Sequence, residues 1–292
     1  MIEFPNAKIN LGLNVTRKSE DGFHEIESVF YPVNWRDSLE ISPREDKTLN
    51  FKAEGMERLP NFESNDLVTK DEFLASGDPE EGPTPPNLVE KAYALMQKHY
   101  DIPGADIILK KDIPMGAGLG GGSSDAAFTL KMVNKLYDLN LSNEKLEEHA
   151  ATLGSDCPFF IQNRPMYVTG KGEKMQPLDL KLNGFYMVLV YPGFHVSTKW
   201  AYSKIVPKPV EADMLMVIKQ DFPQWKKHLK NDFQPLVIKE RDYLLRVIEL
   251  LNNNGSMYTA MTGSGSTVYG IFSEFPEGIQ FHPEDTHVTL PL

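Results

Sequence analysis

The hydrophobic and polar positions along this chain change repeatedly between the period of a strand and the period of a helix. Residues 8–15 alternate strictly between apolar and polar side chains, which predicts a half-buried strand. Shorter runs predict further strands over residues 27–33, 38–42, 105–110, 185–191 and 267–272. Apolar residues at helical spacing predict helices that begin at Asn87 and that span residues 124–137, 143–153 and 243–251. This mixture predicts an α+β fold.

The helix at Asn87 has the clearest start signal. Asn87 can accept a hydrogen bond from the first turn, and Glu90 follows three residues later, as in a capping box. The inward face of this helix is expected to consist of Leu88, Ala92, Leu95, Met96 and His99. The inward face of the next helix is expected to consist of Ala127, Leu130, Val133 and either Leu136 or Tyr137.

The length of the chain allows two domains. It has 292 residues, of which 41% are hydrophobic, and this suffices for a substantial core. We expect domains at residues 1–165 and 166–292, although no linker marks the boundary. Residues 53–86 interrupt the pattern, and residues 77–86 within them read as a polar loop rich in proline and glycine.

A glycine-rich segment at residues 114–127 carries the strongest chemical signal. Five of its fourteen residues are glycine, and Ser123 and Ser124 follow at the expected start of a helix. Glycine lets backbone N–H groups approach a ligand closely, and the N-terminus of a helix favours an anion. No lysine follows the glycines as in a P-loop, and the context of a dinucleotide site is missing. The segment therefore predicts a phosphate site, with a purely structural glycine turn as the alternative.

Composition narrows the function classes. The net charge of −11 and the pI near 5.2 argue against a general nucleic-acid binder, so phosphate binding must rely on local donors. The single cysteine excludes an internal disulfide and fits a reducing compartment. No apolar run approaches the roughly 20 residues of a membrane span, and the first residues do not resemble a signal peptide. We expect a soluble cytoplasmic protein without membrane or nucleic-acid partners.

The glycine segment resembles the second motif of the galactokinase, homoserine kinase, mevalonate kinase and phosphomevalonate kinase superfamily. Residues 6–11 resemble the first motif of that superfamily, and residues 262–266 resemble the third. Residues 21–25 and 154–160 resemble the branch whose members phosphorylate 4-diphosphocytidyl-2-C-methyl-D-erythritol in the non-mevalonate isoprenoid pathway. The resemblance covers the chain from residue 4 to about residue 272. It implies an N-terminal ribosomal-protein-like βαβ domain, a C-terminal α+β domain and an active site in the cleft between them.

The resemblance also implies the catalytic residues of an ATP-dependent kinase. Asp156 corresponds to the base that takes the proton of the acceptor hydroxyl, the 2-hydroxyl of the cytidyl substrate. Lys8 is its expected partner, and it shares one face of its strand with Asn10 while Ile9 and Leu11 face the other way. Without the resemblance, Asp156 would read as a turn residue and Lys8 as a charged residue that protects a sheet edge.

The implied binding residues fall into two groups. The resemblance places adenine near Asn87 and Lys111, and it places the phosphates of ATP, with Mg²⁺, along Pro114, Gly116, Gly118, Gly120, Gly121, Gly122, Ser123 and Ser124. Substrate binding is implied for Asn10, Phe23, His24, Thr198, Tyr202, Gly263 and Gly265. Among these, Phe23 and Tyr202 would flank the cytosine ring and His24 would bond to its edge. The ordinary interpretations are a core aromatic for Phe23, a surface imidazole for His24 and a solvated charge for Lys111. No metal ligand is identified.

Other functions stay open at this point. The enzymatic alternative is a sister kinase that acts on mevalonate, homoserine or a sugar. A non-catalytic sensor built on a kinase fold and a nucleic-acid-binding module are alternatives of other classes. The sequence indicates no oligomeric state. Two features depart from the family pattern, namely the long segment at residues 53–86 and the short C-terminus after the third motif.

Overall fold

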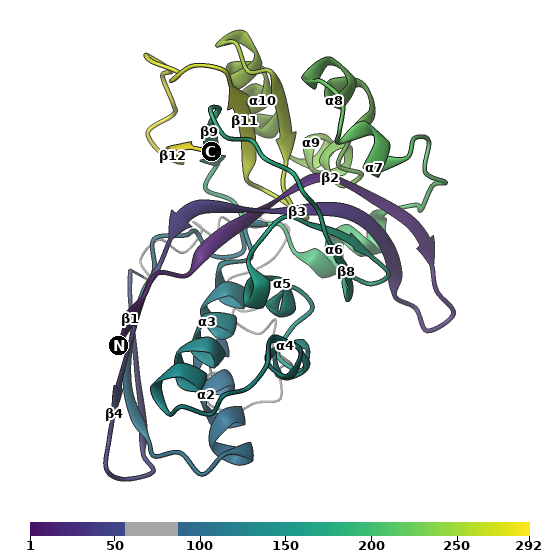
Figure 1. Cartoon of the computed structure of the whole chain (residues 1–292). Coiled ribbons are helices and arrows are strands. Elements are labelled where there is room, and N and C mark those ends of the chain that lie inside the picture. Colours follow the sequence, from purple (N-terminus) through teal and green to yellow (C-terminus); the bar gives the residue numbers. More distant parts are fainter. Residues whose placement is uncertain (56–86) are drawn as a thin grey trace.

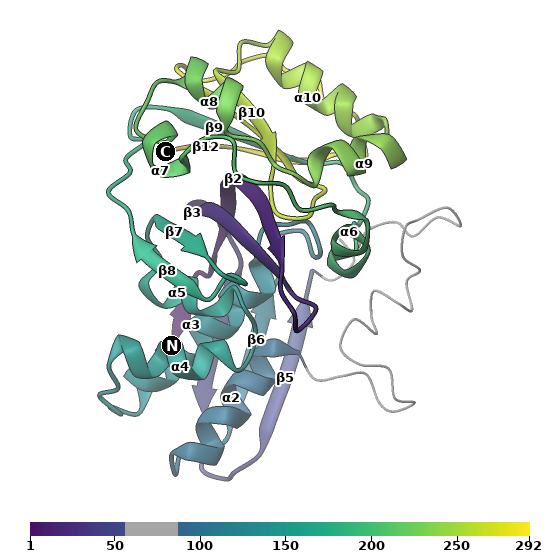
Figure 2. The same cartoon turned by 90° about the vertical axis from the view of Figure 1, so that its right-hand side faces the viewer.

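Two long antiparallel strands, β2 (Asn6–Lys18) and β3 (His24–Arg36), cross the middle of the molecule (Figures 1 and 2). The structure is a computed structural model, and it describes residues 1–55 and 87–292. The expected proline- and glycine-rich loop at residues 77–86 lies outside the described residues. Strands β7 (Met166–Thr169) and β8 (Lys174–Pro177) extend this sheet in the order β2-β3-β7-β8.

Strand β2 is buried on both faces from Asn6 to Leu13, so the expectation of a half-buried strand is wrong. The expected division of its faces is confirmed, because Ile9 and Leu11 pack into a core shared with C-terminal elements. Lys8 lies on the opposite side, with its ammonium 4.5 Å from the ring centre of Phe30, a member of the N-terminal core. The strand thus separates two cores, and its polar face is enclosed by protein.

The N-terminal part packs helices against a second sheet, on one side of the β2–β3 pair (Figure 1). Its strands, in the order β1-β4-β6-β5, are β1 (Ile2–Glu3), β4 (Ser38–Pro43), β6 (Ala105–Lys110) and β5 (Leu49–Glu54). Its helices are α2 (Leu88–His99), α3 (Gly121–Leu136), α4 (Asn143–Ala151) and α5 (Cys157–Gln162). Strands β5 and β6 are parallel, and the other pairs are antiparallel.

The capping box of α2 is confirmed, since Asn87 accepts from the backbone of Val89 and Glu90 accepts from the backbone of Asn87. The predicted inward face is wrong in part. The buried residues of α2 are Val89, Ala92, Tyr93 and Met96, whereas His99 is exposed. The helix is rotated because Tyr93 turns inward, where its hydroxyl bonds to Tyr137 at the end of α3.

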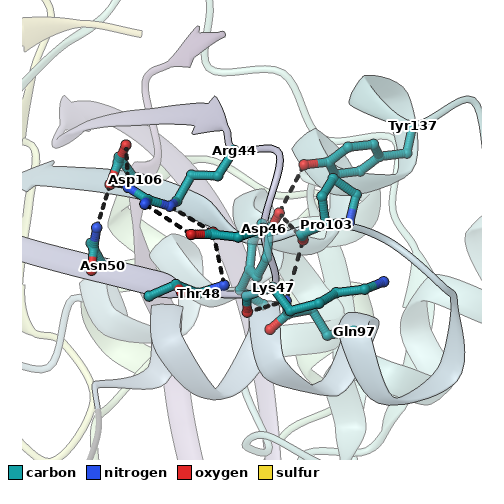
Figure 3. Close-up of polar contacts among 10 residues, drawn as sticks. Arg44, Asp46, Lys47, Thr48, Asn50, Gln97, Pro103, Asp106 and Tyr137 are labelled. Atoms are coloured by element: carbon teal, nitrogen blue, oxygen red, sulfur yellow. Dashed lines mark hydrogen bonds and ion pairs between the residues drawn. The ribbon is translucent and has the colours of Figure 1, made fainter.

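Polar contacts fix the end of α2 that lies away from Asn87 (Figure 3). Gln97 donates to the carbonyl oxygens of Lys47 and Pro103. Arg44, which follows β4, pairs with Asp46 and with Asp106 of β6. This network fixes the C-terminal end of α2 to the loops beside the sheet. The N-terminal end, at Asn87, lies at the candidate site.

The C-terminal part forms the third sheet and the remaining helices, on the other side of the β2–β3 pair (Figures 1 and 2). Its strands, in the order β10-β11-β9-β12, are β10 (Tyr258–Met261), β11 (Val268–Phe272), β9 (Tyr186–Tyr191) and β12 (Thr286–Pro291). Its helices are α6 (Thr198–Lys204), α7 (Met214–Val217), α8 (Phe222–His228), α9 (Gln234–Glu240) and α10 (Tyr243–Asn253). Strand β12, which the sequence pattern does not predict, pairs with β9.

The α+β class is confirmed by this arrangement. The expected domain boundary between residues 165 and 166 falls directly before β7, which pairs with β3. The division of the chain at this point stays a prediction. In the part of the chain that the structure describes, no helix combines the length and apolar character that a membrane crossing requires.

Candidate active site

The glycine segment forms a loop that leads into α3. Gly116, Gly118 and Gly120 adopt positive φ values of 62°, 79° and 70°, and Gly120 caps the helix. Gly121 and Gly122 are already helical, so α3 begins three residues before the expected Ser124. The first turn of a helix presents N–H groups without intrahelical partners, which suits an anion.

A cavity of about 260 Å³ lies against this loop. It is lined by Asn87, Leu88, Lys111, residues 114–123 and Asp125. The structure therefore brings every expected nucleotide residue to one cavity, except Ser124, which is fully buried beneath the loop. A larger cavity of about 560 Å³ lies at residues 178–185 and 218–225, but no expected site residue lines it. We place the candidate site at the smaller cavity because it combines backbone donors with charged groups.

Lys8 and Asp156 meet beside the glycine loop. The ammonium Nζ of Lys8 lies 3.4 Å from Oδ2 of Asp156, and the Lys8 side chain is 5% exposed. The backbone N–H of Lys8 donates to the carbonyl of Leu119 at 2.9 Å, which ties the strand to the loop. Asp156 is the N-cap residue of α5, but its side chain makes no capping hydrogen bond and is 31% exposed, so its carboxylate can receive a proton from a ligand. Side chains 148 residues apart thus form one ion pair.

Asn10 lies at the junction of the first and third motifs. Its Oδ1 accepts from Nζ of Lys8 at 2.7 Å and from the backbone N–H of Gly263 at 3.0 Å. Its Nδ2 donates to Oγ of Ser28 at 2.9 Å, and the residue is 1% exposed. These bonds orient Lys8. Contact between Asn10 and a substrate stays a prediction.

The third motif is pressed against the glycine loop. The hydroxyl of Thr262 donates to the carbonyl of Gly118 at 3.2 Å. A Cβ atom on Gly118 would lie 2.3 Å from the carbonyl oxygen of Thr262, and one on Gly263 would lie 3.0 Å from Cα of Gly118. A Cβ on Gly265 would lie 2.8 Å from Sδ of Met261. The close approach of the two loops therefore accounts for glycine at positions 118 and 263, and the Met261 side chain crowds position 265.

Lys111 is enclosed between two carboxylates. Its Nζ pairs with Asp37 and, at 2.8 Å, with Oδ2 of Asp125, and its side chain is 6% exposed. Burial alone would lower the pKa of Lys111, but the charges of Asp125 and Asp37 outweigh it and raise that pKa. The alternative of a solvated charge is wrong. The ammonium is held on the cavity wall by protein partners.

The expected cytosine-binding residues lie around the turn between β2 and β3 and on α6. The rings of His24 and Tyr202 have centroids 5.2 Å apart at 33°, and Tyr202 packs edge-on against Phe233. Burial, with a smaller effect from the Lys18 charge, lowers the pKa of His24, which favours the neutral imidazole. Burial, followed by the charge of Asp156, raises the pKa of Tyr202 to about 12, so this ring stands within electrostatic reach of the candidate base.

Phe23 is 62% exposed, so its interpretation as a core aromatic is wrong. The ammonium of Lys171 lies 4.6 Å from the centre of its ring, and Lys171 pairs with Asp21 at the same turn. On α6, the hydroxyls of Thr198 and Ser264 are 3.1 Å apart, which joins that helix to the third motif.

Comparison with known proteins agrees with this geometry. Residues 87–164 match the N-terminal domain of GHMP kinases, and residues 216–281 match their C-terminal domain. A 4-diphosphocytidyl-2-C-methyl-D-erythritol kinase of Bacteroides fragilis is 44% identical over 273 residues, which are 94% of this chain and 92% of the relative. A protein of the same name from Cytophaga hutchinsonii is 39% identical over 99% of this chain and 97% of its own length. The chain belongs to the 4-diphosphocytidyl-2-C-methyl-D-erythritol kinase family.

Solved structures confirm the fold of this kinase family member. A crystal structure of 4-(cytidine 5'-diphospho)-2C-methyl-D-erythritol kinase, 30% identical, covers 92% of this chain and 89% of its own with a TM-score of 0.70. Mevalonate kinase of Methanococcus jannaschii has a TM-score of 0.64 at 14% identity, over 93% of this chain and 90% of its own, and so shows likeness of fold alone. The fold is that of a two-domain GHMP kinase.

A kinase of this family uses ATP, and Mg²⁺ commonly accompanies it. Among the described residues, no group of three or more His, Cys, Asp or Glu side chains is placed to hold a metal ion. Mg²⁺ usually keeps several waters and takes phosphate oxygens with one or two carboxylates. A site without such a cluster fits a metal ion that arrives bound to the nucleotide phosphates. We assign no protein ligand to it.

Several residues of the site were missed from the sequence. Asp37 and Asp125 hold Lys111, and Thr262 joins the third motif to the glycine loop. His195 lies in the segment before α6, and its Nδ1 is 2.8 Å from the carbonyl oxygen of Gly116, so Nδ1 carries the proton. Asp125 and Thr262 stand inside recognised motifs and could have been found there. Asp37 has no local signal, since its partner lies 74 residues away.

Proposed function

We propose that this chain transfers the γ-phosphoryl group of ATP to the 2-hydroxyl of 4-diphosphocytidyl-2-C-methyl-D-erythritol, a step of the non-mevalonate isoprenoid pathway. The observation that carries the proposal is the Lys8–Asp156 pair beside a glycine loop, in a chain of this kinase family. The buried state of Cys157, the one cysteine of the sequence, fits a reducing cytoplasm as the place of action.

The chemistry follows from these residues. Backbone N–H groups at the start of α3 bind the phosphates, and Mg²⁺ bound with the nucleotide would reduce their charge. Asp156 takes the proton of the acceptor hydroxyl while that oxygen bonds to the γ-phosphorus and the bond to the leaving ADP oxygen breaks. Lys8 lies 3.4 Å from Asp156 and is oriented by Asn10. Its ammonium stabilises the negative charge that develops on the acceptor oxygen and the transferring phosphoryl group.

The cytidyl group is the part of the substrate that separates this reaction from those of sister kinases. The neutral imidazole of His24 can donate to and accept from the edge of cytosine, and the rings of Tyr202 and Phe23 can stack on its faces. The placement of these rings at the β2–β3 turn and on α6 favours the cytidyl substrate over mevalonate, homoserine or a sugar.

A coupled assay of ADP release tests the proposal. The purified protein is supplied with ATP, Mg²⁺ and, in separate reactions, the cytidyl substrate, mevalonate, homoserine or galactose. We expect turnover with the cytidyl substrate alone. Turnover with mevalonate, homoserine or galactose, and none with the cytidyl substrate, would establish a sister kinase. Nucleotide binding without turnover on any acceptor would favour a sensor.

A further inference from the structure

Three buried charges form one cluster beside the cavity at the glycine loop. The side chains of Asp37, Lys111 and Asp125 are 0%, 6% and 2% exposed, and one ammonium faces two carboxylates. Lys111 and Asp125 line the same cavity as the glycine loop. If both carboxylates are ionised, the group carries one uncompensated negative charge where water is excluded, which is costly. It would also repel the anionic phosphates that the loop is built to bind.

The hydrogen bonds of the two carboxylates are unequal. Oδ1 of Asp37 accepts from the backbone N–H groups of Asp112 and Ile113 at 2.7 and 2.9 Å, and its Oδ2 accepts from Lys111. Asp125 has the Lys111 bond on Oδ2, while its Oδ1 is buried with no hydrogen-bond partner among the described residues. Hydrogen bonds to the charged form favour that form. Three donors therefore stabilise the Asp37 carboxylate and one donor reaches Asp125, so Asp125 is the carboxyl that accepts a proton.

The elements packed against α3 carry titratable groups that have partners of their own. On α2, Glu90 caps Asn87, and on β2, Lys8 pairs with Asp156 at the start of α5. On α4, His149 lies 2.8 Å from the hydroxyl of Tyr100. The charges that act on Asp125 are those of Lys111 and Asp37, and its burial is the larger influence.

We propose that Asp125 is a positioning residue for nucleotide binding and that it takes up a proton from solvent when phosphates occupy the glycine loop. The inference rests on the proposed function, because it requires that a nucleotide binds in this cavity. Protonated Asp125 leaves a neutral Asp37–Lys111 pair and still accepts the Lys111 bond on Oδ2. Lys111 thus stays fixed on the cavity wall without a net negative charge beside the phosphates.

The electrostatics of the free protein support this reading. Burial raises the pKa of Asp125 to about 7, against the lowering effect of Lys111. The free protein is therefore partly ionised at Asp125 near neutral pH. The arrival of an anion favours the protonated form further. Nucleotide binding and proton binding at Asp125 are then linked.

Calorimetry of ADP binding measures the linkage directly. Titrations at about pH 7.5 and higher, in buffers of different protonation enthalpy, give the number of protons taken up. We expect an uptake approaching one proton, and an ADP dissociation constant that rises up to about tenfold per pH unit above the pKa of the free protein. Parallel titrations with and without Mg²⁺ show whether the effect depends on the metal.

Matched variants assign the proton. Asp125→Asn keeps the shape and an acceptor for Lys111, so ADP should bind with no proton uptake at this site and with a flatter pH profile. Asp112→Asn changes the acid beside Lys111 in the chain, whose carboxylate accepts from the Trp35 indole at 2.8 Å, and it should keep the uptake. The same uptake in Asp125→Asn as in the wild type would overturn the proposal.

The proposal and the proposed function can fail separately. ADP binding by the wild type without proton uptake overturns the role of Asp125 and leaves the kinase assignment intact. Absence of ADP binding counts against the proposed function itself. If Asp125→Asn does not fold, carboxyl ¹³C NMR of the wild type decides the matter, because the Asp125 signal must titrate near neutral pH and shift to the protonated value with ADP. An Asp125 signal that stays ionised with ADP overturns the proposal.

Discussion

Replacement of Gly118 by alanine tests the close contact between the glycine loop and the third motif. Gly118 has a φ of +79°, where an L-residue is strained by about 1–2 kcal/mol. The new Cβ would lie 2.3 Å from the carbonyl oxygen of Thr262 and 3.2 Å from that of Gly265. Backbone oxygens cannot move away by a rotamer change, so overpacking adds about 1–3 kcal/mol. We expect Gly118→Ala to destabilise the fold by about 2–5 kcal/mol in total.

Gly122→Ala is the matched control in the same cavity. Gly122 is helical, and its Cβ would meet Leu88 Cδ1 at 3.8 Å, an ordinary contact. Alanine is favoured over glycine within a helix by up to about 1 kcal/mol. The same chemical change, four residues further along the same loop, should therefore leave the free energy of unfolding unchanged or raise it.

Urea unfolding of the two variants and the wild type supplies the measurement. We expect the free energy of unfolding to differ by at least about 2 kcal/mol between the variants. Gly118→Ala should also lower kcat, because displacement of Thr262 disturbs the Asn10 bonds that orient Lys8. If the two variants unfold at the same urea midpoint, the loops do not touch as described and the reasoning is refuted.

Three further predictions concern the chemistry of the site. Asp156→Asn should lower kcat by about 10² or more with little change in substrate binding, and Lys8→Met should lower it as well; unchanged single-turnover rates would remove both from the mechanism. His24→Ala and Phe23→Ala should each weaken binding of the cytidyl substrate by about 1–3 kcal/mol in calorimetry and leave ADP affinity intact; equal loss of both ligands would indicate misfolding. Because the folded-state pKa of Asp125 is raised, it contributes stability that is lost as pH rises from about 4 to about 7. Asp125→Asn should therefore flatten the fall in urea stability over this interval, and an unchanged profile would contradict the shift.

Local signals in the sequence were enough to predict several helices and strands. Strand β6 has the predicted limits, 105–110, and the capping box at Asn87 is present in full. Both depend on side chains within a few residues of one another. The helices α7, α8 and α9 were not predicted, because elements of four to seven residues contain too few turns to show a period.

The sequence pattern could not predict which faces of an element become buried. The alternation in β2 gives the two faces correctly, but the enclosure of the polar face arises from the α3 and α5 region that packs over it. The same limit applies to Lys111, which reads as a surface charge beside Lys110 until Asp37 is brought to it from 74 residues away. Phe23 shows the opposite error, since the ordinary interpretation of an aromatic residue is burial in a core, and Phe23 lies exposed at the turn between β2 and β3.

Hydrogen bonds between side chains and backbone join the three motifs into one unit. Asn10 of the first motif accepts from Gly263 of the third, 253 residues away, and Thr262 donates to Gly118 of the second. Glycine therefore has two separate uses here. At Gly120 it permits the turn that starts α3, whereas at Gly118 and Gly263 it also lets two loops approach so closely that an added Cβ would lie 2.3 or 3.0 Å from the other loop. A motif search detects both kinds of glycine alike. The packed structure shows which of them let the glycine loop and the third motif come together beside the Lys8–Asp156 pair.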